Sequence, residues 1–215
     1  MRFWKESMMK IEEGTKIRIV ASSYFNDDKK RFTRCKSFIY SILSQTYENF
    51  ELFIVHDGAI TECQEKQDLL NIIKSDSRIT LFETPERLEK WGYPHRKKYA
   101  FIDEEFDWLV YTNDDNYYIP TALEMLLGTA QQNKKMLAFS NMISSHRTWD
   151  SLDTFLKLGY IDLGCLMFKK SLIRNFDFDL EGDCFEADGK LVDQIVEAVG
   201  VDNCIKVNNF LFIHN

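Results

Sequence analysis

The sequence has 215 residues, of which 45% are hydrophobic and 28% charged, as in an ordinary globular protein with enough chain for one well-buried domain. Acidic residues outnumber basic ones by 34 to 27, so the formal net charge is −7. This balance argues against a nucleic-acid-binding protein, which usually presents a basic face, and we expect no nucleic-acid partner.

The cysteines and the N-terminal residues bear on the compartment of the protein. The five cysteines are an odd number, widely scattered and without C-x-x-C spacing, which favours reduced thiols over a disulfide framework or a zinc site. Residues 1–15, which we expect to form an N-terminal arm, carry charges where a signal peptide has an apolar core. No apolar run is long enough to cross a bilayer, so we expect a cytoplasmic protein without a transmembrane segment.

Predicted strands and helices alternate through the first half of the chain. In order they are a strand at residues 17–21, a helix at 35–43, a strand at 51–55, a helix at 69–73, a strand at 79–82, a helix at 96–103 and a strand at 108–112. This alternation is typical of a parallel sheet covered by helices.

The second half is less regular. A helix is expected to begin at Pro120, followed by strands at 136–140 and 166–168, a helix at 191–199 and a strand at 210–213. Because the chain has no internal repeat and no Pro/Gly-rich linker, we predict a single α/β domain over residues 16–215.

Three predicted loops follow strands directly, at residues 22–24, 56–58 and 113–116. In parallel sheets, ligands bind outside the carboxyl ends of the strands. We therefore expect these loops to converge on one edge of the sheet and to form a ligand site there.

The clearest chemical signal is the adjacent pair Asp114 and Asp115, just past a predicted buried strand. Neighbouring carboxylates repel each other unless a cation or hydrogen bonds compensate. Hard oxygen ligands of this kind suit Mg²⁺ or Mn²⁺ bridging to a diphosphate. The alternative is a solvated turn ahead of the helix at Pro120, where Asp and Asn are common.

Three segments carry a resemblance to a known family. They are Ser22-Ser23-Tyr24 after the first strand, residues 41–57 (SILSQTYENFELFIVHD) and residues 108–120 (WLVYTNDDNYYIP). On these segments the chain resembles glycosyltransferase family 2, and especially its spore-coat polysaccharide type. The resemblance covers about residues 16–199 and is strongest as far as residue 127.

The resemblance implies a GT-A fold, with a Rossmann-like nucleotide-sugar half at about 16–118, an acceptor half at about 119–215, and a mixed, mainly parallel sheet. It implies an enzyme that uses Mn²⁺ or Mg²⁺ to move a sugar, with inversion, from a nucleotide-sugar donor to a glycan or other hydroxyl acceptor.

Roles on the donor side follow from the same resemblance. Asp115 would bind the metal, and Asp114 would face the ribose or sugar of the donor. Ser22 and Tyr24 would contact the nucleotide, and Asp57 would accept a hydrogen bond from the uracil ring, which favours a UDP-sugar. The alternatives are that Ser22 is an ordinary loop residue and that Asp57 caps a helix.

Two further donor-side assignments are less direct. Residues 91–98 depart from the family pattern, but Arg96 and Lys97 lie at a predicted helix start where they could neutralise a pyrophosphate. The competing interpretation is an exposed basic helix start. His214, after the last predicted strand, corresponds to an extra metal ligand in many GT-A enzymes; the alternative is a frayed chain end.

On the acceptor side, an inverting transfer needs a base that removes the proton of the acceptor hydroxyl. The family has an acid at the start of a late helix, where this chain has Asp188 as the expected base and Glu186 in reserve near the acceptor. Asp162 matches a position that lines the acceptor pocket. Asp188 could alternatively be an ordinary N-cap.

Two functions from other classes remain open. A nucleotidyltransferase shares the α/β sheet and acidic metal site, but it usually has a Gly-rich loop after the first strand, and residues 22–26 contain no glycine. A non-catalytic sugar-nucleotide or glycan binder could keep the fold, although the presence of both Asp115 and Asp188 argues against it. A homo-oligomer is also left open.

Overall fold

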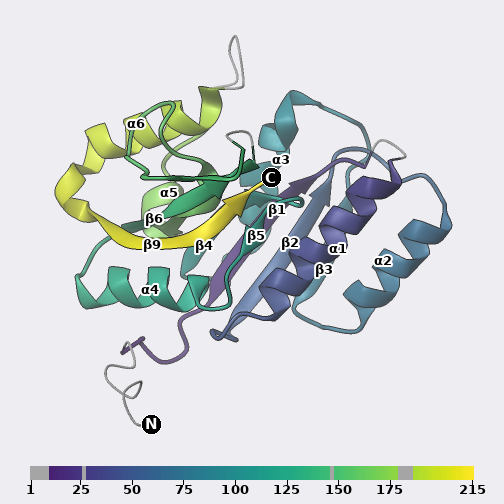
Figure 1. Cartoon of the computed structure of the whole chain (residues 1–215), viewed down its shortest axis with the longest axis horizontal. Coiled ribbons are helices and arrows are strands. Elements are labelled where there is room, and N and C mark those ends of the chain that lie inside the picture. The colour runs from purple at the N-terminus through teal and green to yellow at the C-terminus, as the bar shows by residue number, and fades with distance from the viewer. Residues whose placement is uncertain (1–9, 26–27, 146–147, 179–185) are drawn as a thin grey trace.

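The computed structural model describes residues 10–25, 28–145, 148–178 and 186–215 (Figure 1). The first half forms the strands β1 (Ile17–Ser23), β2 (Phe50–His56), β3 (Ile79–Glu83) and β4 (Trp108–Asn113) and the helices α1 (Lys29–Leu43), α2 (Gln64–Lys74) and α3 (Tyr93–Ala100), the last preceded by the 3₁₀ turn η1 (Lys90–Gly92). These strands pair in parallel, as predicted, and their order in the sheet is β3-β2-β1-β4.

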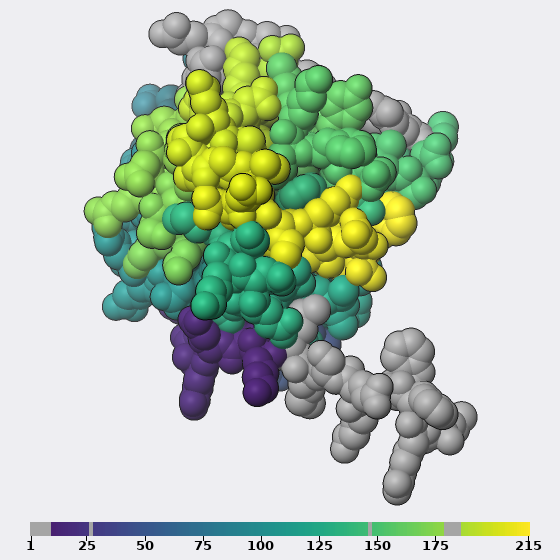
Figure 2. Space-filling view, turned by 90° about the vertical axis from the view of Figure 1, so that its left-hand side faces the viewer, coloured from purple at the N-terminus to yellow at the C-terminus, as the bar shows by residue number. Residues whose placement is uncertain are grey.

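The second half forms β5 (Tyr117–Tyr118), α4 (Ala122–Gln132), β6 (Leu137–Ser144), β7 (Asp150–Leu152), η3 (Leu163–Cys165), β8 (Leu166–Lys169), α5 (Lys170–Ile173), α6 (Ala187–Val199), η5 (Val201–Asn203) and β9 (Cys204–His214). These strands extend the sheet to β3-β2-β1-β4-β8-β6-β9-β5, with β7 paired to β6. Strand β8 runs antiparallel to β4 and β6, so the sheet is mixed. The C-terminal residues, yellow in Figure 2, cover much of one side of the molecule.

Helices cover the parallel part of the sheet. Helices α1 and α2 contact each other, and Figure 1 shows α1 in front of the strands, whereas α3 packs against β1 and β2. The chain first moves outward from β1 through β2 to β3, and it then returns past β1 to β4. Because both kinds of connection are right-handed, the helices of the outward path and the helix of the return path lie on opposite faces of the sheet. All seven residues of β1 are therefore buried, including the charged Arg18 among its apolar neighbours.

Every strand and helix predicted from the pattern occurs, although several bounds differ; α1 and α6, for example, begin earlier than expected. Helix α4 begins at Ala122 and not at Pro120, because the Pro120 carbonyl accepts the Thr46 N–H at 2.7 Å. The helix expected at 96–103 is α3, which ends at Ala100. The last strand is longer than residues 210–213, since β9 runs the full length of β6.

Membrane and cysteine predictions concern the described part of the chain. No helix there is long and apolar enough to span a membrane. Its four cysteines, Cys35, Cys63, Cys165 and Cys204, are free. Cys184 and residues 1–9 of the predicted N-terminal arm lie outside the described residues.

The end of α3 is fixed by a buried arginine on β1. Arg18 is fully buried, and its guanidinium donates to the carbonyl oxygen of Ala100 at 2.8 Å. The same group pairs with Glu51 at 2.6 Å and with Asp103 at 2.5 Å. It also lies 4.4 Å from the centre of the Phe53 ring. These contacts satisfy a charge that would otherwise be costly to bury, and they end the helix three residues earlier than predicted.

We predict that Arg18→Ala lowers the free energy of unfolding by about 3–5 kcal/mol, because it breaks a buried ion cluster and leaves a cavity. Arg78→Ala is the matched control, since Arg78 also stacks on a phenylalanine and pairs with an aspartate but has a side chain 31% exposed. Its loss should be about 1 kcal/mol or less. Urea denaturation measures both, and equal small losses would contradict the role assigned to Arg18.

Candidate active site

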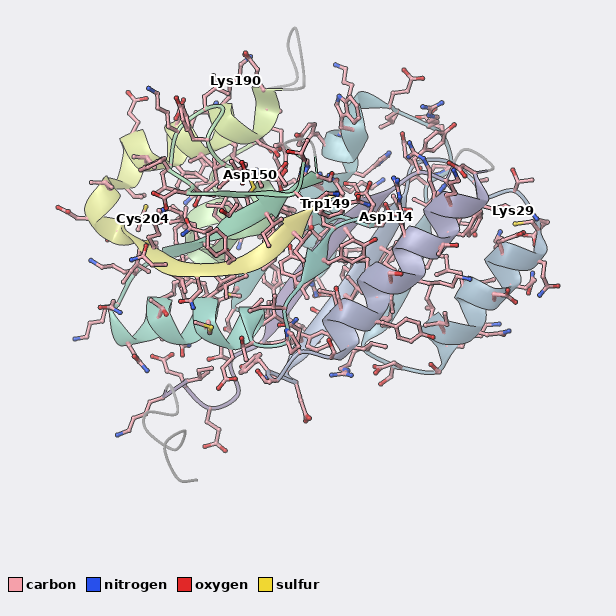
Figure 3. All side chains as sticks on the ribbon, viewed as in Figure 1. Lys29, Asp114, Trp149, Asp150, Lys190 and Cys204 are labelled. Atoms are coloured by element: carbon pink, nitrogen blue, oxygen red, sulfur yellow. The ribbon has the colours of Figure 1, made fainter. Side chains whose placement is uncertain are left out.

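The carboxyl ends of three strands lie side by side. In the parallel ladders, Ser22 of β1 is level with Val55 of β2 and with Asn113 of β4. The loops that follow these strands therefore meet at one edge of the sheet, which confirms the predicted convergence. Asp114 and Asp115 directly follow β4 at this edge, and Figure 3 labels Asp114 near the middle of the view.

The two aspartates are partly buried, and their neighbouring groups differ. Ser23 donates its hydroxyl to Asp114 at 2.5 Å, and the Asp114 N–H donates to the Ser22 carbonyl at 3.1 Å. Burial raises the pKa of Asp114 to about 7, and repulsion by Asp115 adds to the effect. Burial also raises the pKa of Asp115, while Arg34 and His214 oppose the increase. A pair that resists carrying two charges is suited to binding a cation.

His214 is held at this edge by the sheet. It is level with Ser144 of β6, so the alternative of a frayed end is wrong. Its Nε2 lies 3.5 Å from Oδ2 of Asp162, and its charge acts on Asp115. The described residues contain no group of three His, Cys, Asp or Glu side chains that could hold a metal ion. An oxygen-nitrogen pair such as Asp115 and His214 suits Mn²⁺ or Mg²⁺ only if further ligands come from a bound molecule.

Arg96 lies beside the acidic edge. Its side chain is buried, so the alternative of an exposed basic helix start is wrong for this residue. Its Nε donates to the Ser22 hydroxyl at 3.1 Å, and one terminal nitrogen donates to Oδ1 of Asn113 at 2.7 Å. The other terminal nitrogen is buried without a hydrogen-bond partner among the described residues. An unsatisfied buried donor is costly, so this N–H favours an anionic ligand.

Unlike the neighbouring Arg96, which contacts Ser22 and Asn113, Lys97 forms an ion pair with Asp177. Its ammonium pairs with Asp177 at 2.9 Å, and its side chain is one-third exposed. The structure therefore brings Arg96 to Ser22 and Asn113 but engages Lys97 elsewhere.

Asp57 is buried after β2 and already has three donors. Its carboxylate accepts the N–H groups of Leu88 and Glu89, each at 2.8 Å, and lies 2.9 Å from Nε2 of His95. The helix-cap alternative is wrong, because Cys63 caps α2 and the partners of Asp57 come from the segment before α3 and from α3 itself. A nucleobase that reached Asp57 would have to share or displace these donors.

Tyr24 directly follows β1 and lines a small hollow. The Arg87 guanidinium lies 3.8 Å above its ring, and the His56 ring centre is 5.8 Å away. The hollow is lined by Tyr24, Phe25, Phe32, His56, Ala59, Ile60 and Thr61. An aromatic ring beside a hollow at the strand ends can stack on a planar ligand.

Asp188 lies in the first turn of α6. The N-cap position belongs to Glu186, whose side chain makes no cap hydrogen bond, so the N-cap alternative for Asp188 is wrong. Tyr93 donates its hydroxyl to Oδ1 of Asp188, and the Leu163 N–H donates weakly to Oδ2 at 3.4 Å. Burial raises the pKa of Asp188 to about 6; Asp162 adds to this and Arg96 opposes it. Such a carboxylate is mostly ionised at neutral pH yet more basic than usual, as a general base requires.

The remaining predicted acids differ in exposure. Asp162 accepts the Gly164 N–H at 2.7 Å and acts on Asp188 by charge, so it belongs to the same acidic cluster. Glu186 is exposed, and its carboxylate is 4.0 Å from the Lys190 ammonium. Four further residues contribute hydrogen bonds to the site although no sequence pattern indicated a role for them: Ser23, Tyr93, His95 and Asn113. Tyr93 is adjacent to the noted basic segment, but nothing in the sequence connects it to a residue 95 positions later.

Comparisons of the sequence with known proteins find glycosyltransferases. A sequence model described as "Glycosyl transferase family 2" matches residues 30–161. An uncharacterized glycosyltransferase of Rickettsia bellii is 25% identical over 115 residues, which are 54% of this chain and 15% of that protein. One from Haemophilus influenzae is 28% identical over 103 residues, 48% of this chain and 39% of that protein. The chain thus spans well under half the length of these relatives.

Solved structures share the fold. TarS of S. aureus, residues 1–349 in complex with UDP, superposes with a TM-score of 0.70 at 10% identity, covering 93% of this chain and 60% of that one. The mannosyltransferase PcManGT from Pyrobaculum calidifontis, in complex with GDP-Man and Mn²⁺, gives a TM-score of 0.66 at 13% identity, covering 96% and 59%.

The approach of η1 to β1 can be tested at Gly92. Its φ is +74°, and an added Cβ would lie 2.7 Å from both Cβ and Oγ of Ser22. Gly159 has a similar φ of +81° but open space around it. Alanine at either site should cost about 1 kcal/mol of backbone strain, and Gly92→Ala should lose about 1–3 kcal/mol more from overpacking. Urea denaturation of both variants checks this, and equal losses would contradict the tight contact.

Proposed function

This chain belongs to glycosyl transferase family 2 and has the GT-A fold, and on that premise we propose that it transfers a sugar from a nucleotide-sugar donor to a hydroxyl acceptor. The observation that carries the proposal is the meeting of Asp114 and Asp115 with the unsatisfied N–H of Arg96 at the same strand ends. A metal-bound nucleoside diphosphate suits both features, because its metal ion offsets the charge of the aspartates and its phosphate oxygens accept the N–H of Arg96.

Asp115 and His214 are the residues that would hold a divalent metal, Mn²⁺ or Mg²⁺. When bound, the metal would neutralise the charge that develops on the departing diphosphate. With two protein side chains as ligands, such a metal would need further oxygen ligands from the bound donor or from water. The neighbouring Asp114, fixed by Ser23, would accept a hydrogen bond from the ribose or sugar.

The donor would lie over Ser22, Tyr24, Asp57 and Arg96. In this proposal the free N–H of Arg96 donates to a diphosphate oxygen, and Tyr24 stacks on the base. Asp57 accepts the imide N–H of uracil, which is why we propose a UDP-sugar. Lys97 stays a prediction for the same diphosphate, and it would first have to leave Asp177.

Asp188 is the proposed base of a single displacement. Its carboxylate takes the proton of the acceptor hydroxyl as that oxygen forms a bond to C1 of the sugar. The bond between C1 and the diphosphate oxygen breaks at the same time, and the electron pair leaves with UDP. Attack from the opposite side inverts the configuration. Asp162 and the exposed Glu186 would face the acceptor, a glycan or another hydroxyl compound.

Because the chain belongs to a glycosyltransferase family, a nucleotidyltransferase activity is no longer favoured. An activity assay distinguishes an active transferase from a non-catalytic relative with the same fold. A cytoplasmic location, a role in polysaccharide biosynthesis and a homo-oligomeric state stay predictions.

The first test is metal-dependent turnover. With Mn²⁺ we expect release of UDP from at least one of UDP-glucose, UDP-galactose and UDP-N-acetylglucosamine, and Asp115→Ala should lower the rate by about 100-fold or more. Asp202→Ala, at an exposed acid of η5, is the control and should keep the parent rate. Binding of UDP without turnover of any donor would favour the non-catalytic relative, and turnover unchanged by EDTA would defeat the metal assignment.

The second test is nucleotide choice. In the presence of Mn²⁺, UDP should raise the Tm more than GDP or ADP, because ligand binding stabilises the native state. Asp57→Ala should remove this preference. Since Asp57 also holds Leu88 and Glu89, the Tm without nucleotide must be compared first. Equal shifts from the three nucleotides in the parent protein would contradict recognition of uracil.

A further inference from the structure

The first turn of α3 contacts three parts of the site through three side chains. Tyr93 donates to Asp188, His95 contacts Asp57 at 2.9 Å, and Arg96 donates to Ser22 at 3.1 Å. Two of these contacts concern the proposed donor side. The third, from Tyr93, reaches the proposed base on α6, although the two residues are far apart in sequence.

The Tyr93 ring has little freedom. It is buried, with the Arg96 guanidinium 4.7 Å from the ring centre and the Phe178 ring 4.9 Å away. The packing of the ring therefore fixes the direction from which its hydroxyl donates to Oδ1 of Asp188. Within the described ranges of the chain, Oδ2 receives only the long contact from the Leu163 N–H at 3.4 Å. The two oxygens differ, and Oδ2 keeps the capacity to accept another proton donor.

The backbone that presents Tyr93 is unusual. Glu89, Lys90, Trp91 and Gly92 all have positive φ, at 60°, 51°, 56° and 74°. Only glycine adopts this region easily, so three successive larger residues there store strain that surrounding contacts must offset. Asp57 supplies such contacts by accepting the N–H groups of residues 88 and 89. Strain of this kind persists where the position of the following residues matters.

We propose that Tyr93 is a positioning residue for the transfer: its hydroxyl holds Oδ1 of Asp188 so that Oδ2 faces the acceptor hydroxyl. This inference rests on the proposed function, in which Asp188 is the base.

The same contact also lowers the pKa of Asp188, against the larger effect of burial, which raises it. The groups that face Asp188 are Tyr93 and Arg96 from α3 and Asp162 and Cys165 from the segment before β8. A hydroxyl that donates to a carboxylate stabilises its ionised form. Removing the hydroxyl should therefore raise the pKa of Asp188, and the pH above which the base is active should rise with it. If Tyr93 served packing alone, its replacement would not change the pH above which Asp188 is active.

Tyr93→Phe removes only the hydroxyl and is the variant to test. We expect Mn²⁺-dependent UDP release, from the UDP-sugar that the parent hydrolyses, to fall about tenfold at pH 7 with UDP affinity unchanged. The acidic limb of the rate profile should move up by about one pH unit. Tyr99→Phe is the matched control, because Tyr99 is a second buried tyrosine of α3 that packs on Phe82 and His95. It should leave rate and profile as in the parent.

A second measurement does not depend on turnover. Carbon-13 NMR of aspartate-labelled protein follows the carboxyl of Asp188, identified by its absence in Asp188→Asn. Its pKa should rise in Tyr93→Phe and not in Tyr99→Phe. An unmoved pKa, or a parent rate and profile in Tyr93→Phe, overturns the positioning role. Loss of UDP binding in Tyr93→Phe overturns it too, because the residue would then belong to the donor side.

Asp188→Asn separates this inference from the proposed function. If Tyr93 acts through Asp188, adding Tyr93→Phe to Asp188→Asn should lower the rate no further. If Asp188→Asn alone keeps the parent rate while the pKa of Asp188 still responds to Tyr93→Phe, the assignment of the base fails and the contact stands. A further loss of rate in the double variant overturns the positioning role.

Discussion

Repulsion among acidic side chains at the strand ends is the constraint on which the rest of the site depends. Burial raises the pKa of Asp114 and of Asp188, and repulsion by the neighbouring Asp115 and Asp162, respectively, raises each pKa further. Only a few cationic groups, with Arg96 the most buried, act against this charge. The free energy of the site is therefore lowest when a ligand brings additional positive charge. A protein with a net charge of −7 can bind a phosphorylated ligand in this way without a broad basic surface.

Helix α3 connects this charged edge to the core. Its last turn ends on Arg18, which is buried in an ion cluster, and its first turn carries Tyr93, His95 and Arg96 into the site. One end of this short helix is therefore hydrogen-bonded to a buried residue of the sheet, while the other end contacts the site. Binding groups on a short, anchored helix are held more accurately than groups on a loop.

Much of the fold follows from local sequence. Apolar runs and helical periodicity place the strands and helices, and the rule for parallel sheets brings the loops after β1, β2 and β4 together. Contacts across long sequence separations do not follow: Tyr93 with Asp188, or Asp57 with Leu88. Nor does the sequence reveal the left-handed run at Glu89, since no local preference of a non-glycine residue favours it. Such features arise from tertiary packing and strain.

The carboxylate of Asp57 already accepts hydrogen bonds from within the protein, and this affects which nucleobases it would favour. A base that offers an N–H exchanges one hydrogen bond of the carboxylate for another, and such an exchange contributes only about 1 kcal/mol. A base that presents a lone pair at the same place faces a buried negative charge and is disfavoured by much more. Asp57 would therefore act as a filter: it would add little to the tightness of a correct complex, and its main effect would be rejection of the wrong hydrogen-bonding edge.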